Sequence, residues 1–511
     1  MAKTFELETL KIRLNDADFQ RLDLNQRIQR ALRALILDAA LGPGVKLPAT
    51  RVLSKSLGVA RDTVENAYVQ LHRDGYIVRR EGSGSYVSDS VGAQLRGAAR
   101  RRARPDPAHS AAEPGAGLSR RGRMILDSGG IADQQTIKAF ATGLPETRNF
   151  PVDVWERLQR QVLRDFRASV LLHGDPQGAE PLRRAIAAYL NLERGAKVAP
   201  EQILVLSSTR QALYLCAQLL VDAGKPILME NPGYFGARKA FESAEVRIVP
   251  IDVDAQGIRT DLLRADRSGA NCVYVTPSHQ YPTGATLSLA RRLDLTGWAA
   301  AHGKWIIEDD YDSEFHYDGL PTACVQGLDR HQRTIYLGTF SKTLYPGLRM
   351  GYMALPRELM GAFSRARSIM DGHTPQILQL TLARFMEDGH YNAHVRAMRK
   401  LYAGRREALF ESIGRHLGGI ATAIRPPGGL QVPCLLERGW SEEETIRLAA
   451  AAGVKLAGLG WLYAGAPQRQ GWLLGYAALT TYEIEAAMLR LANTLGSRPS
   501  PGRGRRAGRS Q

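Results

Sequence analysis

Long hydrophobic runs are missing from this sequence of 511 residues. No apolar stretch approaches the ~18 residues that a membrane-spanning helix needs. The first residues, Met1–Glu6, also lack the pattern of a secretory signal peptide. We therefore expect a protein of the cytoplasm.

Cysteine is equally scarce, with four widely separated residues and no CxxC pair. This spacing excludes a zinc ribbon and a dense disulfide framework, and it fits a reducing compartment. We expect no metal site. The four cysteines are Cys216, Cys272, Cys324 and Cys434.

Acidic residues are sparse in two segments, and this explains much of the formal net charge of +17. Residues 91–123 hold eight arginines against two acids, and residues 497–511 hold five arginines and no acid. Eleven of the seventeen excess charges therefore lie in stretches rich in Gly, Pro, Ser and Ala, which are not expected to pack. The charge predicts salt-sensitive affinity for nucleic acid, but not a folded basic face.

The two basic, Gly-, Pro-, Ser- and Ala-rich segments mark the boundaries of the folded domains. Residues 91–125 read as a basic linker and residues 497–511 as a disordered basic tail. The linker separates an N-terminal domain at 20–90 from a larger domain at 135–495, and it is long enough to let the two move independently.

The N-terminal domain has the pattern of a winged helix-turn-helix. Helices are predicted at Thr50–Leu57 and Arg61–Asp74 around Gly58, and two short strands follow within 76–87. The second helix suits the major groove of DNA, and the wing suits phosphate or the minor groove. The pattern alone is equally consistent with a small packing or dimerisation domain. The candidate DNA contacts are Arg51, Arg61, Thr63, Arg79 and Arg80.

In the larger domain, strand-like runs alternate with helical segments. This rhythm predicts an α/β fold with a mostly parallel central sheet covered on both faces. Residues 390–495 read as a smaller α+β part with a helix at Asn392–Leu417 and strands at Leu430–Leu436 and Trp472–Ala477. The strands expected in the central sheet are Ile203–Leu206, Pro226–Met229, Val246–Val249, Asn271–Val275, Trp305–Ile307 and Thr334–Leu337, with helices at 181–193, 210–222, 233–243 and 288–302.

Several strand ends carry residues suited to a phosphorylated aldehyde cofactor. Lys342 follows a strand, and its neighbour Arg349 is a cation of the kind that keeps an amine partly neutral and reactive. Hydroxyls at Ser208 and Thr209 open a helix, whose free N–H groups favour phosphate. Asp309 ends a strand, where a carboxylate keeps a pyridine nitrogen protonated. Ligands bind at the carboxyl ends of such strands, so these groups are expected to converge.

Two sets of motifs resemble known families. LPATRVL at 47–53, LGVARDTV at 57–64, LHRDGY at 71–76 and GSGSYV at 82–87 resemble a GntR-type DNA-binding domain, although Ala60 stands where that family usually has a Ser cap. SSTRQAL at 207–213, EDDY at 308–311 and the stretch from Ser341 to Arg349 resemble a fold-type I aminotransferase over about 135–495. The combination resembles MocR-type transcriptional regulators.

The resemblance to aminotransferases implies pyridoxal 5'-phosphate as cofactor. Lys342 would form the internal aldimine, Asp309 would pair with the pyridine nitrogen, Tyr311 would reach the phenolic oxygen, and Tyr234 would stack on the ring. The phosphate would be held by Ser208, Thr209, Arg210, Thr339, Ser341 and Arg349.

Three positions depart from the aminotransferase pattern. Tyr281 replaces the Asn that bonds the phenolic oxygen, and the preceding pair, His279 and Gln280, is the candidate substitute. His173 replaces a Tyr that reaches the partner's cofactor phosphate. Leu473 stands where an Arg binds the substrate carboxylate, and Arg469 nearby is the candidate to compensate. Without that Arg, turnover is expected to be slow or absent.

The leading hypothesis is a regulator whose large domain senses pyridoxal phosphate or an amino compound and controls operator binding. The MocR resemblance implies a head-to-tail homodimer, which would read repeated half-sites on double-stranded DNA. The main alternative is a working aminotransferase with an accessory DNA-binding domain, and a third is an oligomeric cofactor-binding scaffold.

Overall fold

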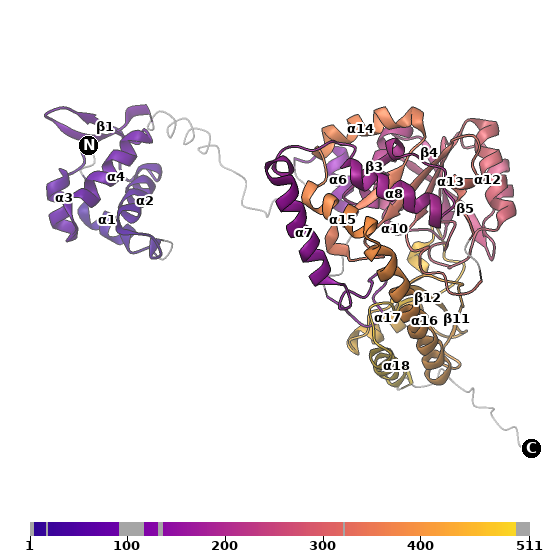
Figure 1. The fold of residues 1–511 in the computed structure, drawn as a ribbon. Helices are drawn as coiled ribbons and strands as arrows, with labels where there is room; N and C mark the ends of the chain where they lie inside the picture. The colour runs from indigo at the N-terminus through magenta and orange to yellow at the C-terminus, as the bar shows by residue number, and fades with distance from the viewer. Residues whose placement is uncertain (1–4, 17–18, 91–116, 131–135, 320–321, 497–511) are drawn as a thin grey trace, which may run out of the picture. The chain divides into compact units, whose positions relative to one another are not determined.

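The computed structural model describes residues 5–16, 19–90, 117–130, 136–319 and 322–496. The chain divides into two compact units, one ending at Ala116 and the other beginning at Gly117 (Figure 1). Most of the predicted linker and the whole predicted tail lie outside the described residues. No helix in the described part is long and apolar enough to cross a membrane.

The first unit is a helical domain with a two-stranded wing, built around its own apolar core. Gly58 and Gly75 adopt left-handed φ values of 67° and 79°, which end the helix before each of them. Ala60 precedes the fourth helix without a side-chain cap. The elements are α1 (Leu7–Leu14), α2 (Leu24–Leu37), α3 (Thr50–Leu57), α4 (Arg61–Arg73), β1 (Ile77–Arg80) and β2 (Gly84–Val87).

A mixed eight-stranded sheet organises the second unit, in the order β3-β10-β9-β8-β7-β4-β5-β6. Strands β5, β4, β7, β8 and β9 run parallel, as predicted. β10 is antiparallel to both neighbours, and β6 is antiparallel to β5. The strands are β3 (Ile203–Leu206), β4 (Pro226–Asn231), β5 (Arg247–Asp254), β6 (Gly257–Ile258), β7 (Cys272–Val275), β8 (Trp305–Asp310), β9 (Thr334–Thr339) and β10 (Gly351–Ala354).

Side chains of each strand alternate between two apolar layers, because strand residues point to opposite faces in turn. On β7, Cys272 and Tyr274 pack with one group of helices, whereas Val273 and Val275 pack with another. One face carries α9 (Thr209–Leu220), α10 (Phe235–Ser243) and α14 (Arg357–Asp371). The opposite face carries α7 (Val152–Phe166), α8 (Glu180–Glu193), α11 (Thr260–Ala265), α12 (Leu289–His302), α13 (Val325–Leu328) and α15 (Gln376–Glu387).

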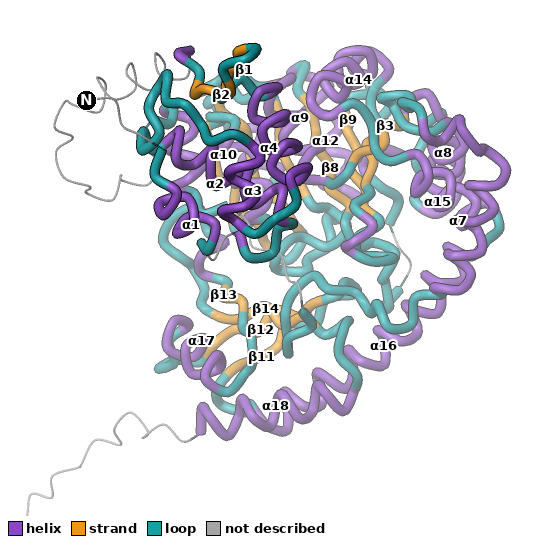
Figure 2. Tube along the Cα trace, turned by 90° about the vertical axis from the view of Figure 1, so that its left-hand side faces the viewer, coloured by secondary structure: helices purple, strands orange, loops and turns teal. Residues whose placement is uncertain are grey.

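A smaller layer holds the antiparallel sheet β11-β12-β14-β13 with α17 and α18 (Figure 2). Helix α16 (His390–His416) joins the two layers, since Val395 packs in the core of the large layer and Leu409 in that of the small one. The other elements are β11 (Ala421–Ala423), β12 (Gln431–Leu436), α17 (Glu442–Ala451), β13 (Ala457–Gly458), β14 (Gly471–Gly475) and α18 (Thr481–Gly496).

The end of the predicted linker is ordered, contrary to the expectation that it would not pack. Helix α6 (Arg120–Asp127) begins at Ser119, whose hydroxyl accepts a hydrogen bond from Gly122 N at 3.0 Å. Arg121 pairs with Glu245 at 3.0 Å and so attaches this helix to the large unit. Arg120 also pairs with Glu245, so local capping and two ion pairs overcome a composition that is typical of a linker.

Candidate functional site

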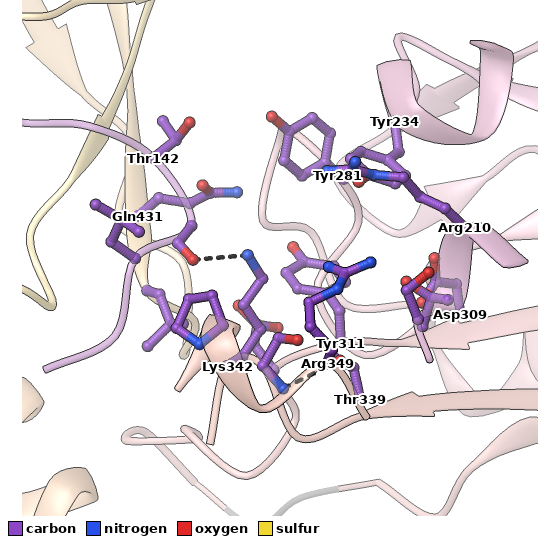
Figure 3. A pocket seen from close by; sticks show the side chains of 18 of the residues that line it. Thr142, Arg210, Tyr234, Tyr281, Asp309, Tyr311, Thr339, Lys342, Arg349 and Gln431 are labelled. Carbon is purple, nitrogen blue, oxygen red and sulfur yellow. Dashed lines mark hydrogen bonds between the residues drawn. The ribbon is translucent and has the colours of Figure 1, made fainter. Parts of the chain in front are cut away.

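One cavity of about 430 Å³ gathers residues from several strand ends of the large sheet (Figure 3). Ten of the eleven predicted cofactor residues line it: Ser208, Thr209, Arg210, Tyr234, Asp309, Tyr311, Thr339, Ser341, Lys342 and Arg349. The strands bring them together because β8 ends at Asp310, β9 ends at Thr339, and β3 and β4 end just before Ser208 and Tyr234.

The two arginines of the cavity lie on the same side of it (Figure 3). Arg210 belongs to the first turn of α9, which Ser208 caps by accepting a hydrogen bond from Gln211 N at 3.3 Å. Arg349 adopts a left-handed φ of 51°, and Ser341 N donates to Thr339 Oγ1 at 3.1 Å. A helix N-terminus, two guanidinium groups and several hydroxyls together suit a phosphate dianion.

Lys342 points away from these arginines, towards the side of the cavity that Thr142 and Gln431 line (Figure 3). Its Nζ donates a hydrogen bond to the main-chain oxygen of Gly143 at 2.6 Å. Gly143 has a φ of 75°, and a Cβ built there would lie 2.6 Å from Lys342 Nζ. The amine can occupy this position only because residue 143 has no side chain.

Asp309 lies in the wall of the cavity with 3% of its surface exposed. Tyr274 donates a hydrogen bond to Asp309 Oδ2 at 2.7 Å, whereas Oδ1 has no hydrogen-bond partner among the described residues. Burial raises the pKa of Asp309 to about 7, although the Tyr274 bond opposes this. An orphaned carboxylate oxygen beside a cavity fits a cationic N–H group of a bound ring.

Three tyrosines form the aromatic part of the wall. Tyr311 donates a hydrogen bond to the main-chain oxygen of His279 at 3.0 Å, and burial raises its pKa well above the usual value. The rings of Tyr234 and Tyr281 meet edge to face, with centroids 5.4 Å apart. Tyr281, noted in the sequence only as a departure, thus occupies the cavity itself.

His279 is not among the residues that line the cavity, contrary to prediction. Its Nδ1 lies 2.8 Å from Asp312 Oδ1, and its ring stacks on His316 at 6.0 Å. The neighbouring Gln280 donates to Glu230 at 3.2 Å and to Pro232 O at 2.9 Å. Neither side chain therefore takes the place of the missing Asn, because buried polar partners hold both elsewhere.

Arg469 lines a different cavity, of about 770 Å³, and not the one that contains Lys342. Leu473 lies fully buried in β14, in an apolar cluster with Leu459 and Leu462 that also contacts Tyr281. The structure therefore does not place Arg469 where it could replace the missing carboxylate-binding Arg.

The sequence did not single out several residues of the cavity wall. Two segments far from Lys342 in the sequence also line the cavity: Thr142–Leu144, which is at least 198 positions away, and Leu430–Gln431, which is at least 88 positions away. No local pattern signals such an approach. The lining residues without a sequence prediction are Thr142, Gly143, Leu144, Asp312, Pro346, Gly347, Leu430 and Gln431. Among the described residues, no group of three or more His, Cys, Asp or Glu is placed to hold a metal ion.

In the first unit, the candidate DNA contacts differ in how they are held. Arg51 and Arg61 are exposed near the starts of α3 and α4, and Thr63 is half-buried. Arg79 of the wing pairs with Glu65 of α4 at 2.8 Å. Arg80 lies over the ring of Tyr86, 4.8 Å from its centroid. These contacts attach the wing to the recognition helix and brace the hairpin.

Comparison with known proteins matches both units. The aminotransferase class I and II family matches residues 140–433, and the gntR family of bacterial regulatory proteins matches residues 24–87. The probable rhizopine catabolism regulatory protein MocR of Rhizobium meliloti is 36% identical over 471 residues, which cover 91% of each chain. The transcriptional regulator TauR of Rhodobacter capsulatus is 30% identical, covering 92% of this chain and 96% of its own.

The large unit also matches solved aminotransferases. The α-aminoadipate aminotransferase LysN of Thermus thermophilus, solved with N-(5'-phosphopyridoxyl)-L-leucine, aligns with a TM-score of 0.66 and 28% identity, covering 75% of this chain and 96% of its own. A GntR-type helix-turn-helix domain thus precedes an aminotransferase fold in one chain, and relatives with the same arrangement are named transcriptional regulators. The chain belongs to the MocR-type family of bacterial transcriptional regulators.

Proposed function

We propose that the cavity around Lys342 holds pyridoxal 5'-phosphate and that its occupancy sets the affinity of the GntR-type domain for operator DNA. The observation that carries this proposal is the convergence of ten predicted cofactor residues on one cavity, together with the orphaned oxygen of Asp309. When bound, the cofactor supplies an aldehyde that bonds covalently to amines and a ring that withdraws electrons.

Each residue has a distinct task in this proposal. Lys342 is the amine that holds the cofactor covalently, and Tyr234 stacks on the ring. Asp309 holds the proton of the ring nitrogen, and this cationic partner lowers the raised pKa of Asp309. Tyr311 contacts the phenolic oxygen. The phosphate is bound by Ser208, Thr209, Arg210, Thr339, Ser341 and Arg349, all of which line the cavity.

A homodimer would place two reader domains on repeated half-sites of double-stranded DNA. Exposed apolar side chains of the large unit support self-association: Leu171 is 74% exposed and Ile369 is 86% exposed. The rings of His173 and His373 meet edge to face, with centroids 5.7 Å apart. The segment that carries Leu171 therefore lies beside the segment that carries Ile369. We propose a head-to-tail arrangement, with Arg51, Arg61, Thr63, Arg79 and Arg80 contacting DNA.

A working aminotransferase is the second candidate, because Lys342, Asp309 and Tyr311 share one cavity. The burial of Leu473 in an apolar cluster argues against efficient turnover, since a carboxylate substrate finds no guanidinium at that position. Rapid transfer of an amino group from a common amino acid to a keto acid would favour the enzyme over the regulator.

Operator binding by the full chain tests the proposal. We expect affinity to change at least tenfold between the protein without cofactor and the protein with pyridoxal phosphate or with an added amine. Lys342→Ala should abolish this response, whereas Lys400→Ala, an exposed lysine on α16, should retain it. Operator affinity that ignores the cofactor and every amine would rule out the sensing role.

A further inference from the structure

Helix α10 runs from the wall of the cavity to the helix that ends the linker. Tyr234, the residue immediately before α10, lines the cavity. Just beyond the other end of α10, Glu245 forms ion pairs with Arg120 and Arg121 of α6. A short helix moves as a unit, because each turn is hydrogen-bonded to the next. One rigid element therefore contacts both the proposed cofactor site and the place where the linker joins the large unit.

The ring of Tyr234 lies against the first turn of α10. A Cβ built on Gly236 would overlap this ring, so the ring can occupy its position because residue 236 has no side chain. One turn along, Arg238 donates hydrogen bonds to the main-chain oxygens of Leu462 and Tyr463 at 2.6 and 3.2 Å. These bonds tie the segment between β13 and β14 to α10. A shift of the cofactor ring or of the small layer would therefore act directly on this end of α10.

At the other end of α10, Glu245 occupies an unusual backbone conformation. Its φ of 62° is left-handed, and glycine is the usual residue with this conformation just after a helix. The turn is closed all the same, because Glu245 N donates to Glu242 O at 2.8 Å and Val246 N donates to Phe241 O at 3.0 Å. A side chain kept at a strained backbone position points to a use for that side chain. Here the carboxylate meets two guanidinium groups of α6.

The rest of α6 contributes little to its attachment. None of its residues is buried, and the side chains of Ile125 and Leu126 are almost half exposed. Met124 lines a hollow beside α10 together with Val246. Ion pairs at a protein surface are individually weak, and salt screens them. We therefore expect that α6 can leave α10 without unfolding of the large unit.

We propose that α6 is a releasable clasp on the linker and that cofactor in the cavity tightens this clasp through α10. The inference rests on the proposed function, because it describes how occupancy of the cavity reaches the linker. A bound ring stacked on Tyr234 restricts the motion of α10 and of Glu245 behind it, so α6 docks more firmly. When α6 is released, residues 117–130 join the linker. A longer flexible linker lowers the effective concentration of a second DNA-binding domain at its half-site.

Hydrogen exchange of the full chain, with and without pyridoxal phosphate, tests the path from cavity to clasp. In the loaded protein, we expect the amides of α6 and of the last turn of α10 to exchange at least fivefold more slowly than in the protein without cofactor. Equal exchange of α6 in the two forms would overturn the inference. Slower exchange in α6 without slower exchange in α10 would overturn the role of α10.

Reversal of the charge at Glu245 tests the clasp itself. Glu245→Arg places a cation against Arg120 and Arg121, so it should remove the cofactor effect on α6 exchange and leave the effect on α10. It should also reduce the tenfold effect of cofactor on operator affinity to less than about threefold. The charge-swapped variant Arg120→Glu, Arg121→Glu, Glu245→Arg should restore both responses. Glu411→Arg, at an exposed position of α16, is the matched control and should behave like the parent protein.

The visible absorbance band of lysine-bound cofactor separates this inference from the proposed function. A normal band and a full operator response in Glu245→Arg would overturn only the clasp. Absence of the band in the parent protein, or operator affinity that ignores the cofactor, would overturn the proposed function and the clasp with it. Melting temperature shows whether each variant is folded. If Glu245→Arg is unfolded, Glu245→Gln removes the charge at constant size and gives the same comparison.

Discussion

At the scale of single residues, the absence of a side chain at Gly143 determines where the amine of Lys342 can lie. A Cβ at this position would be 2.6 Å from Lys342 Nζ, and the φ of 75° is one that other residues rarely adopt. Gly361 of α14 offers a comparison, because a Cβ there meets nothing within 4 Å.

We expect Gly143→Ala to weaken binding of pyridoxal phosphate by at least tenfold, because the methyl group displaces Lys342 Nζ. Gly361→Ala should leave cofactor binding unchanged. Titration of the visible absorbance band with pyridoxal phosphate measures both effects. A normal band in Gly143→Ala would show that the amine does not need this position.

Asp309 couples cofactor binding to pH. Burial raises its pKa to about 7, well above that of the same carboxyl in the unfolded chain. The folded protein without cofactor therefore binds more protons than the unfolded chain between about pH 4 and 7, so the contribution of Asp309 to stability falls as pH rises through that range. Above pH 7 the carboxylate is charged, and the full free-energy cost of burying that charge lowers the stability of the folded protein.

Asp309→Asn removes this titration while keeping an acceptor for Tyr274. In the absence of cofactor, we expect the variant to melt higher than the parent protein at pH 8 and to differ little at pH 5. The same substitution should weaken pyridoxal phosphate binding at pH 8, because the partner of the ring proton is lost. Thermal melts at both values, with and without cofactor, measure these effects. If the difference in melting temperature between Asp309→Asn and the parent protein did not depend on pH, a raised pKa of Asp309 would be contradicted.

At the scale of secondary-structure elements, we propose that helix α4 and the wing are the parts of the GntR-type domain that contact DNA. Exposed Arg51 and Arg61 lie near the starts of α3 and α4, as in other helix-turn-helix domains. The ion pair between Arg79 and Glu65 fixes the wing against α4. This ion pair holds the wing against α4 within the domain itself.

The double variant Arg51→Ala, Arg61→Ala should bind operator DNA less tightly and with a weaker dependence on salt. Each lost phosphate contact lowers the slope of log affinity against log salt by about one. The control is Arg30→Ala, which removes an exposed arginine of α2 that is not among the candidate DNA contacts, and it should change neither quantity. An unchanged slope in the double variant would show that these two arginines do not contact phosphate.

At the scale of the whole molecule, charge and folded structure are unevenly distributed. The tail at 497–511 contributes five of the seventeen excess positive charges, and it lies outside the described residues. Within the large unit, α16 contributes to the cores of both layers, so movement of one layer against the other must involve this helix.

Deleting residues 497–511 should weaken binding to non-operator DNA at low salt while leaving the preference among operator sequences intact. Nonspecific affinity arises from counterion release, which scales with positive charge, whereas sequence is read by base contacts. Fluorescence anisotropy with operator and scrambled duplexes across salt concentrations measures both terms. If the deletion weakened binding to the operator and to the scrambled duplex equally, the tail would not act on nonspecific affinity alone, and this prediction would be wrong.

Much of the site could be predicted because its residues follow strands. Ser208, Asp309 and Lys342 stand beside strands whose hydrophobic runs are plain in the sequence, and parallel strands bring their carboxyl ends to one edge. His279 also follows a strand, but the carboxylate of Asp312 holds its ring outside the cavity lining. Such competition between neighbouring polar groups has no signature in the local sequence.

The sequence by itself determined the two-domain plan, the motif at each strand end and the family, because hydrophobic periodicity and short motifs are local properties. Only the tertiary structure decided which groups face the ligand. Gly143 and Gln431 reach Lys342 through long-range packing of the small layer on the large one, and Arg469 is turned to another cavity. These placements depend on contacts between residues far apart in the chain, which a pattern of neighbours cannot encode.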